Sequence, residues 1–114
     1  MKIDFSNRTV IVTGGTKGIG LSFVKLFEKS NAKVIFTGRQ KRENDLSNLY
    51  FDNKKIKYKR LDLNDDNSIV NFLKYLKQLN RIDVLINNAG INKIDSIIDI
   101  DNADWGRINN VNLR

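Results

Sequence analysis

Four glycines lie within seven positions of the stretch TGGTKGIG, residues 13–20, where they separate two apolar runs. The run before them, Thr9–Thr13, is short and rich in β-branched residues, as buried strands are. After them, apolar residues recur at helical spacing from Ile19, so a helix is expected to begin at about Gly18. The first N–H groups of a helix are unpaired and carry partial positive charge, and glycines let a phosphate approach them closely. Residues 14–20, called the glycine turn below, therefore predict an anion site.

Polar residues also end the other apolar runs of the chain. The second run ends in TGR at residues 37–39, the third in LDL at 61–63 and the fourth in NNAG at 87–90. In open parallel sheets, ligands bind outside the carboxyl ends of the strands. These residues are therefore candidates for the same site as the glycine turn.

The composition removes several classes of chemistry. The 114 residues contain no cysteine and no histidine, which excludes disulfides, thiolate nucleophiles, histidine bases and the usual zinc sites. No run approaches the roughly 18 apolar residues of a membrane span, and the first residues carry no apolar signal segment, so we expect a cytoplasmic protein without a membrane partner. The net charge of +7 comes from dispersed lysines and arginines without an aromatic platform, which favours a solvated surface over nucleic-acid binding.

Strands and helices alternate along the chain. We expect strands over Thr9–Thr13, Lys33–Gly38, Lys55–Leu63 and Arg81–Asn87. We expect helices from Gly18, over Lys41–Phe51, from Asp66 to about Leu79 with Asn64 or Asp65 as the cap, and from about Asn102 to Arg114. Short strands joined by helical crossovers predict an α/β fold, a Rossmann-type doubly wound parallel sheet covered on both faces.

The glycine spacing and the fourth strand end together resemble one family. The glycines at 14, 18 and 20 do not fit the commoner spacing G-x-G-x-x-G, but with NNAG they resemble the short-chain dehydrogenase/reductase family. The KGIG turn, NNAGI and the pattern W-x-x-x-x-x-VNL look most like bacterial 3-oxoacyl-[acyl-carrier-protein] reductases. The resemblance implies that residues 1–114 are the N-terminal, incomplete portion of an NAD(P)-binding domain. It also implies hydride transfer between the cofactor and a small carbonyl or alcohol, for which a 3-oxoacyl thioester, a sugar or another ketone fits equally.

The cofactor would bind at the glycine turn. Its pyrophosphate would meet the backbone of residues 14–20, with Gly14, Thr16, Lys17, Gly18, Ile19 and Gly20 as the candidate contacts, although Gly20 also suits close packing of helix on strand. Arg39 stands where an NAD-preferring site usually offers a carboxylate to the ribose hydroxyls. With Lys17 it could neutralise a 2′-phosphate, which favours NADP(H) over NAD(H). The alternative is that both are ordinary exposed cations.

The remaining site residues follow from the resemblance alone. It places Asp62 and Leu63 at the adenine edge, although Asp62 could equally cap or terminate its strand. It also places Asn88, Ala89 and Gly90 against the cofactor ribose, while Asn87 is expected to tie neighbouring strands together. Asn112 falls where the family carries an active-site asparagine on a long helix, holding a water of the proton relay.

The family's catalytic serine and its Y-x-x-x-K tyrosine and lysine have no counterpart at the expected place. The one literal match, Tyr50 to Lys54, lies between the second and third strands, on the adenine side of the sheet. We therefore expect the chain to be truncated after the fourth strand and the following helix, with the edge of Arg81–Asn87 unpaired, a marginal and association-prone fold, and no activity alone. The longer form is expected to be a homo-oligomer. The alternative is a non-catalytic NADP(H)-binding remnant of a truncated gene.

Overall fold

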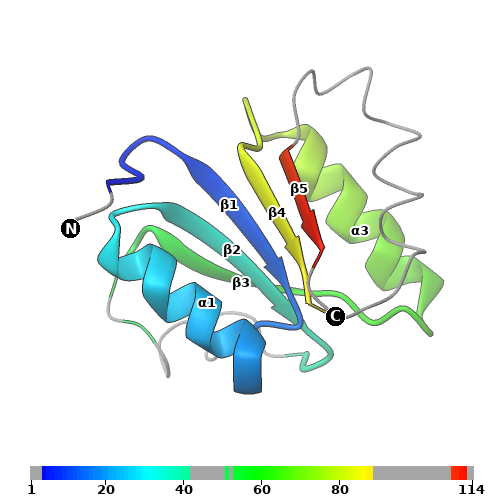
Figure 1. The fold of residues 1–114 in the computed structure, drawn as a ribbon. Coiled ribbons are helices and arrows are strands. Elements are labelled where there is room, and N and C mark those ends of the chain that lie inside the picture. Colours follow the sequence, from blue (N-terminus) through cyan, green and yellow to red (C-terminus); the bar gives the residue numbers. More distant parts are fainter. Residues whose placement is uncertain (1–3, 42–50, 52, 89–108, 113–114) are drawn as a thin grey trace.

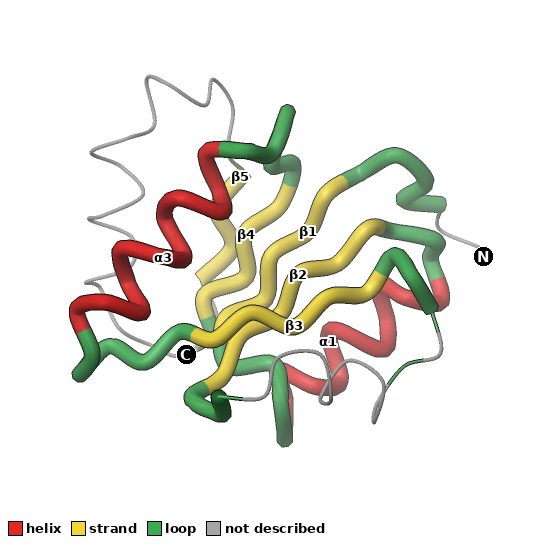
Figure 2. The backbone as a smooth tube through the Cα atoms, turned by 180° about the vertical axis from the view of Figure 1, so that it is seen from behind, coloured by secondary structure: helices red, strands yellow, loops and turns green. Residues whose placement is uncertain are grey.

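The computed structural model describes residues 4–41, 51, 53–88 and 109–112. They form one parallel sheet in the strand order β3-β2-β1-β4-β5, with helices on both faces (Figures 1 and 2). The strands are β1 (Thr9–Thr13), β2 (Lys33–Gly38), β3 (Ile56–Arg60), β4 (Val84–Asn87) and β5 (Asn109–Asn112), and the helices are α1 (Gly18–Lys29) and α3 (Asp66–Lys77). The predicted α/β plan with a doubly wound parallel sheet is confirmed.

Alternate residues of the central strands pack against opposite helices. Val10 and Val12 of β1 belong to the apolar cluster beneath α1, whereas Ile11 faces the cluster beneath α3. All five residues of β1 are buried, because a parallel strand in mid-sheet is covered on both faces. Figure 1 shows α1 in front of the sheet, and the reverse view of Figure 2 shows α3 in front of the other face. The two clusters thus hold the strand ends at fixed positions.

The predicted boundaries are most accurate where turn chemistry is strongest. Strands Thr9–Thr13 and Lys33–Gly38 and the start of α1 at Gly18 are confirmed. Of the two cap candidates for α3, Asp65 is the cap, because its side chain accepts the Asn67 N–H at 3.0 Å. The third and fourth strands are shorter than predicted, since β3 ends at Arg60 and β4 begins only at Val84.

The helix predicted from about Asn102 is wrong over its described part. Asn109–Asn112 forms β5, which pairs with β4 from Val84↔Asn109 to Asn87↔Asn112. Asparagine and valine are weak helix formers, whereas strand pairing satisfies the backbone groups on the second edge of β4. The edge of β4 is therefore paired rather than exposed as predicted. The body of the predicted helix Lys41–Phe51 lies outside the described residues.

Within the part of the chain that the structure describes, no helix is long and apolar enough to cross a bilayer. The same residues contain no group of three or more carboxylates that could hold a metal ion.

Candidate functional site

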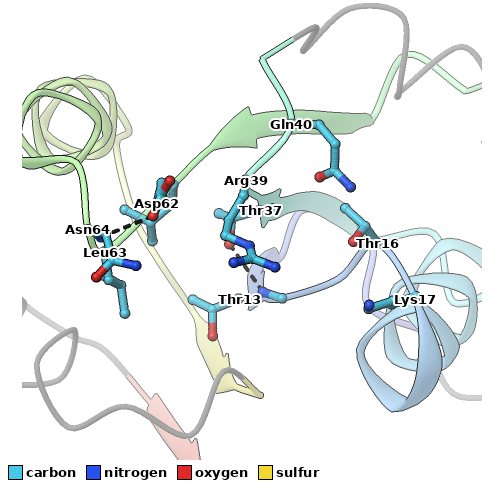
Figure 3. A pocket seen from close by; sticks show the side chains of 12 residues that line it. Thr13, Thr16, Lys17, Thr37, Arg39, Gln40, Asp62, Leu63 and Asn64 are labelled. Carbon is cyan, nitrogen blue, oxygen red and sulfur yellow. Dashed lines mark hydrogen bonds between the residues drawn. The ribbon is translucent and has the colours of Figure 1, made fainter.

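A cavity of about 340 Å³ opens at the carboxyl ends of β1, β2 and β3. It brings together six residues that the sequence nominated, namely Gly14, Thr16, Lys17, Arg39, Asp62 and Leu63. Of the other six, Thr37, Gly38 and Leu61 belong to the strand-end segments TGR and LDL that were expected near the site, although no role was predicted for them singly. Sequence reasoning missed Thr13, Gln40 and Asn64, each of which lies next to a predicted site residue, so the position at a strand end was the signal that could have found them. Figure 3 shows how the side chains surround the cavity.

The glycine turn is tied to the end of β2. The Gly14 N–H donates to Thr37 Oγ1 at 3.2 Å, and the Gly15 N–H donates to the Thr37 carbonyl at 2.9 Å. Gly14 and Gly18 have φ values of 67° and 61°, in the left-handed region that favours glycine. Thr37 is buried, so the turn is anchored on a fixed neighbour.

Gly20 allows α1 to pass against the start of the turn. A Cβ atom at this position would lie 2.1 Å from the Gly14 carbonyl oxygen and 2.7 Å from Asn88 Nδ2. Asn88 Nδ2 itself donates to the Gly14 carbonyl at 3.1 Å, which joins the end of β4 to the turn. The close helix packing expected at Gly20 is present. The structural role of the Asn88 side chain was missed.

Within the part of the chain that the structure describes, no side chain caps the N-terminus of α1. Its N-cap residue is Lys17, which makes no capping hydrogen bond, and its first turn contains no acidic residue. The other helix, α3, has the opposite arrangement, with Asp65 as cap and Asp66 in the first turn. The Arg60 guanidinium donates to Asp65 and holds the pKa of that carboxyl below its usual range. A carboxylate thus stabilises the positive end of α3, whereas the positive end of α1 is open to an external anion.

Two cations line the cavity beside this helix end. Lys17 and Arg39 are both exposed, and Figure 3 shows their charged groups directed into the same region of the cavity. Among the described residues, neither has a carboxylate within ion-pair distance. The cations and the uncapped helix end therefore make this side of the cavity suited to phosphate.

The opposite wall is built by the turn that follows β3. Asp62 Oδ1 accepts the Asn64 N–H at 3.0 Å, and Asp62 Oδ2 lies 3.6 Å from the Arg60 guanidinium. The Ser68 hydroxyl accepts the Asp62 N–H at 2.9 Å. Asp62 thus closes the turn that begins two residues after the end of β3 at Arg60, instead of terminating the strand itself, and it lines the cavity.

Three further predicted residues do not line this cavity but directly follow its lining residue Lys17 along the chain. Gly18, Ile19 and Gly20 form the first turn of α1 beyond it, and Ile19 is 67% exposed. Thr13 Oγ1 donates to Asn87 Oδ1 at 3.1 Å, which confirms the tie between strands expected of Asn87.

Four positions of the predicted catalytic and ribose regions have no side-chain description. Ala89, Gly90 and Tyr50 lie outside the described residues. The backbone of Asn112 ends β5 and pairs with Asn87, so this residue lies on a strand and not on the helix that its predicted role assumed.

Known proteins with similar sequences include several oxidoreductases. A family model described as short chain dehydrogenase matches residues 8–114. The chain is 32% identical over 116 residues to the 3-oxoacyl-[acyl-carrier-protein] reductase FabG of Chlamydia pneumoniae, covering 99% of this chain and 47% of that protein. It is 33% identical over 113 residues to the 3alpha-hydroxysteroid dehydrogenase of Mediterraneibacter gnavus, covering 94% of this chain and 45% of that protein. The chain spans about half the length of these curated relatives.

A solved structure shows the same fold. The crystal structure of a short chain dehydrogenase from Bacillus anthracis matches with a TM-score of 0.59 and 30% identity, covering 71% of this chain and 35% of that one. The family match, the parallel sheet and the glycine turn at the end of β1 all indicate the same family. The chain therefore belongs to the short-chain dehydrogenase family.

Proposed function

We propose that this chain is the cofactor-binding portion of an NADP(H)-dependent oxidoreductase acting on a carbonyl or alcohol. The observation that carries the proposal is the uncapped N-terminus of α1, which opens beside Lys17 and Arg39 at one cavity. The nicotinamide, when bound, supplies or accepts the hydride. Every other step proposed here is binding or orientation by residues of the chain.

The glycine turn would hold the cofactor pyrophosphate. The N–H groups of Gly18 and Ile19 begin α1 and have no capping side chain among the described residues. The helix dipole adds positive potential at this point, and the positive φ of Gly18 directs the backbone into the helix without a side chain in the way. Thr37 and Asn88 keep the turn in this shape from either side.

Arg39 and Lys17 would bind the 2′-phosphate that distinguishes NADP(H) from NAD(H). A guanidinium can donate two parallel hydrogen bonds to a phosphate, and the Lys17 ammonium adds a second positive charge at the same cavity. A site that prefers NAD(H) usually offers a carboxylate to the ribose hydroxyls, and position 39 offers none. Asp62 and Leu63 on the opposite wall would contact the adenine.

The substrate class is proposed from the names of the relatives, and the assembly from the resemblance to the family. The relatives named as a 3-oxoacyl-[acyl-carrier-protein] reductase and a 3alpha-hydroxysteroid dehydrogenase match this chain over slightly less than half of their own length. We propose a small ketone or alcohol, with a 3-oxoacyl thioester as the first to test, a homo-oligomer for the longer form, and a cytoplasmic location. By resemblance to the family, Asn88, Ala89 and Gly90 would pack on the ribose, and Asn112, although it lies on β5 and not on a helix, would orient a water of the proton relay. A non-catalytic NADP(H)-binding remnant is the second candidate.

The test compares the nucleotide affinities of two charge-reversal variants, one at each end of β2. Arg39→Asp removes the proposed phosphate contact, whereas Lys33→Asp makes the same reversal at the exposed first residue of the strand. A charge-assisted hydrogen bond contributes about 1.5–3 kcal/mol, so Arg39→Asp should weaken NADPH binding at least about tenfold. NADH binding by Arg39→Asp, and both affinities of Lys33→Asp, should change little. Equal loss of NADPH and NADH in fluorescence titrations would refute the assignment.

Turnover separates the two candidate functions. We expect residues 1–114 alone to show no ketone-dependent oxidation of NADPH, because the Tyr50 to Lys54 match lies between the second and third strands in sequence. A protein extended beyond Arg114 that reduces a 3-oxoacyl thioester would support the enzyme. Turnover by the 114 residues alone would instead require a role for Tyr50 and Lys54.

A further inference from the structure

One guanidinium at the end of β3 contacts both sides of the candidate site. Arg60 is 18% exposed, and its Nε donates to the Arg39 carbonyl at 3.2 Å. Its Nη1 donates to Asp65 Oδ2 at 2.8 Å, and its Nη2 lies 3.6 Å from Asp62 Oδ2. Arg60 thus joins the segment after β2, the turn after β3 and the N-cap of α3. It is not itself part of the cavity wall.

The segment that carries Arg39 is held by three successive carbonyl groups. The Gly38 carbonyl accepts the Leu61 N–H at 2.7 Å, the Arg39 carbonyl accepts Arg60 Nε, and the Gln40 carbonyl accepts the Tyr58 hydroxyl at 2.9 Å. All three donors belong to β3 or to the residue that follows it. The parallel pairing of β2 with β3 brings them into reach, since Gly38 lies opposite Arg60. The backbone that presents Arg39 is therefore set by β3.

The effect of Arg60 on a bound phosphate would be positional and not electrostatic. Its positive charge faces two carboxylates, Asp62 and Asp65, whereas Arg39 and Lys17 face none among the described residues. The rigid fork of a guanidinium can donate from Nε and Nη1 in different directions at once. A lysine ammonium at the same position is a point charge on a flexible stem and cannot reproduce both bonds. The variant Arg60→Lys therefore keeps the positive charge at position 60 but loses the geometry of the guanidinium hydrogen bonds.

We propose that Arg60 is a positioning residue for 2′-phosphate recognition, fixing the Arg39 backbone so that the Arg39 side chain meets a nucleotide 2′-phosphate. This inference rests on the proposed function. Its signature is a loss of selectivity for the 2′-phosphate, with binding of the rest of the nucleotide retained. The Asp62 carboxylate should stay in place without Arg60, because the Asn64 N–H also holds it.

The experiment measures binding of 2′,5′-ADP and of 5′-AMP, two probes that differ by the 2′-phosphate alone. For the unmodified protein we expect 2′,5′-ADP to bind at least about tenfold more tightly than 5′-AMP. Arg60→Lys should reduce this ratio at least about fivefold, since small misplacements of a binding group lower its contribution strongly. Its affinity for 5′-AMP should change less than about twofold. Arg81→Lys is the matched control, because Arg81 pairs with Asp83 away from the cavity, and its ratio should not change.

If Arg60→Lys does not fold, a second variant tests the positioning role of Arg60. Asp65→Asn keeps a residue that caps helices as well as aspartate but weakens the anchor of the Arg60 guanidinium, so it should fold and still lower the ratio. An unchanged ratio in Arg60→Lys, or in Asp65→Asn when only that variant folds, overturns the positioning role and leaves the proposed function standing. If the unmodified protein binds 2′,5′-ADP and 5′-AMP equally, the NADP(H) assignment is wrong. The proposed positioning role of Arg60 is then refuted as well.

Discussion

Replacing Gly20 by alanine should disrupt the glycine turn more than the same change at Gly18. The new Cβ at Gly20 would lie 2.1 Å from the Gly14 carbonyl oxygen, and a tolerable contact of 3.0 Å requires a shift of at least ~0.9 Å. The nearest atom is a backbone oxygen, which cannot turn aside as a side-chain end does, and the Asn88 amide is held by its hydrogen bond to that same oxygen. At Gly18 a Cβ has no atom within 4 Å, but φ is +61°. Alanine at position 20 thus tests a steric requirement for glycine, whereas alanine at position 18 tests a conformational one.

The expected losses of folding free energy follow from the left-handed backbone at Gly18 and from the steric clash at Gly20. At Gly18 the left-handed backbone costs an alanine about 1–2 kcal/mol of folding free energy. At Gly20 the shift costs about 1–3 kcal/mol as overpacking. It also strains the hydrogen bonds of Gly14 with Thr37 and Asn88, each worth about 0.5–1.5 kcal/mol. We expect Gly20→Ala to lose about 2–6 kcal/mol in total.

Urea unfolding of both variants, with and without NADPH, tests this reasoning. Gly18→Asn is a further control, since asparagine enters the left-handed region more readily than alanine and should lose less stability than Gly18→Ala. Gly20→Ala should also lose most of its stabilisation by NADPH, because the displaced turn no longer presents its N–H groups. The reasoning is wrong if Gly20→Ala unfolds at the same urea concentration as the unmodified protein or is stabilised equally by NADPH.

Two further predictions concern side chains that fix the strand ends. Burial raises the pKa of Asp83, but the Thr9 N–H at 2.8 Å and two guanidinium groups outweigh it and leave the pKa below the ordinary value of an aspartate. The stability from this carboxylate is therefore complete above about pH 4 and is lost as the pH falls through the lowered folded-state pKa. Asp83→Asn should cost about 1.5–3 kcal/mol at neutral pH, and a stability–pH curve that keeps its acid slope in this variant would contradict the assignment. Thr37→Val removes the acceptor of the Gly14 N–H and should cost about 1 kcal/mol, so an unchanged urea midpoint would show that this bond contributes nothing.

The sequence predicted the local features of the central strands well. The β-branched run at Thr9–Thr13 and the glycines after it placed β1 and the start of α1, because backbone conformation there depends on neighbouring residues. The cap at Asp65 was predicted to within one residue for the same reason. The prediction was wrong at Asn109–Asn112, where apolar spacing suggested a helix. Pairing with β4, a contact between residues distant in the chain, outweighed that local pattern.

For the site as well, some features could be predicted from the sequence, whereas others depended on tertiary contacts. Residue types and spacing by themselves predicted an anion site at the glycine turn and gave Lys17 and Arg39 as the candidate cations. Only the tertiary structure decided that Thr37 and Asn88 hold the turn and that Arg60 holds the backbone of Arg39. These bonds join residues 21 to 74 positions apart. Parallel pairing of β1, β2, β3 and β4 brings their carboxyl ends to one edge of the sheet, and no local pattern encodes which side chains meet there.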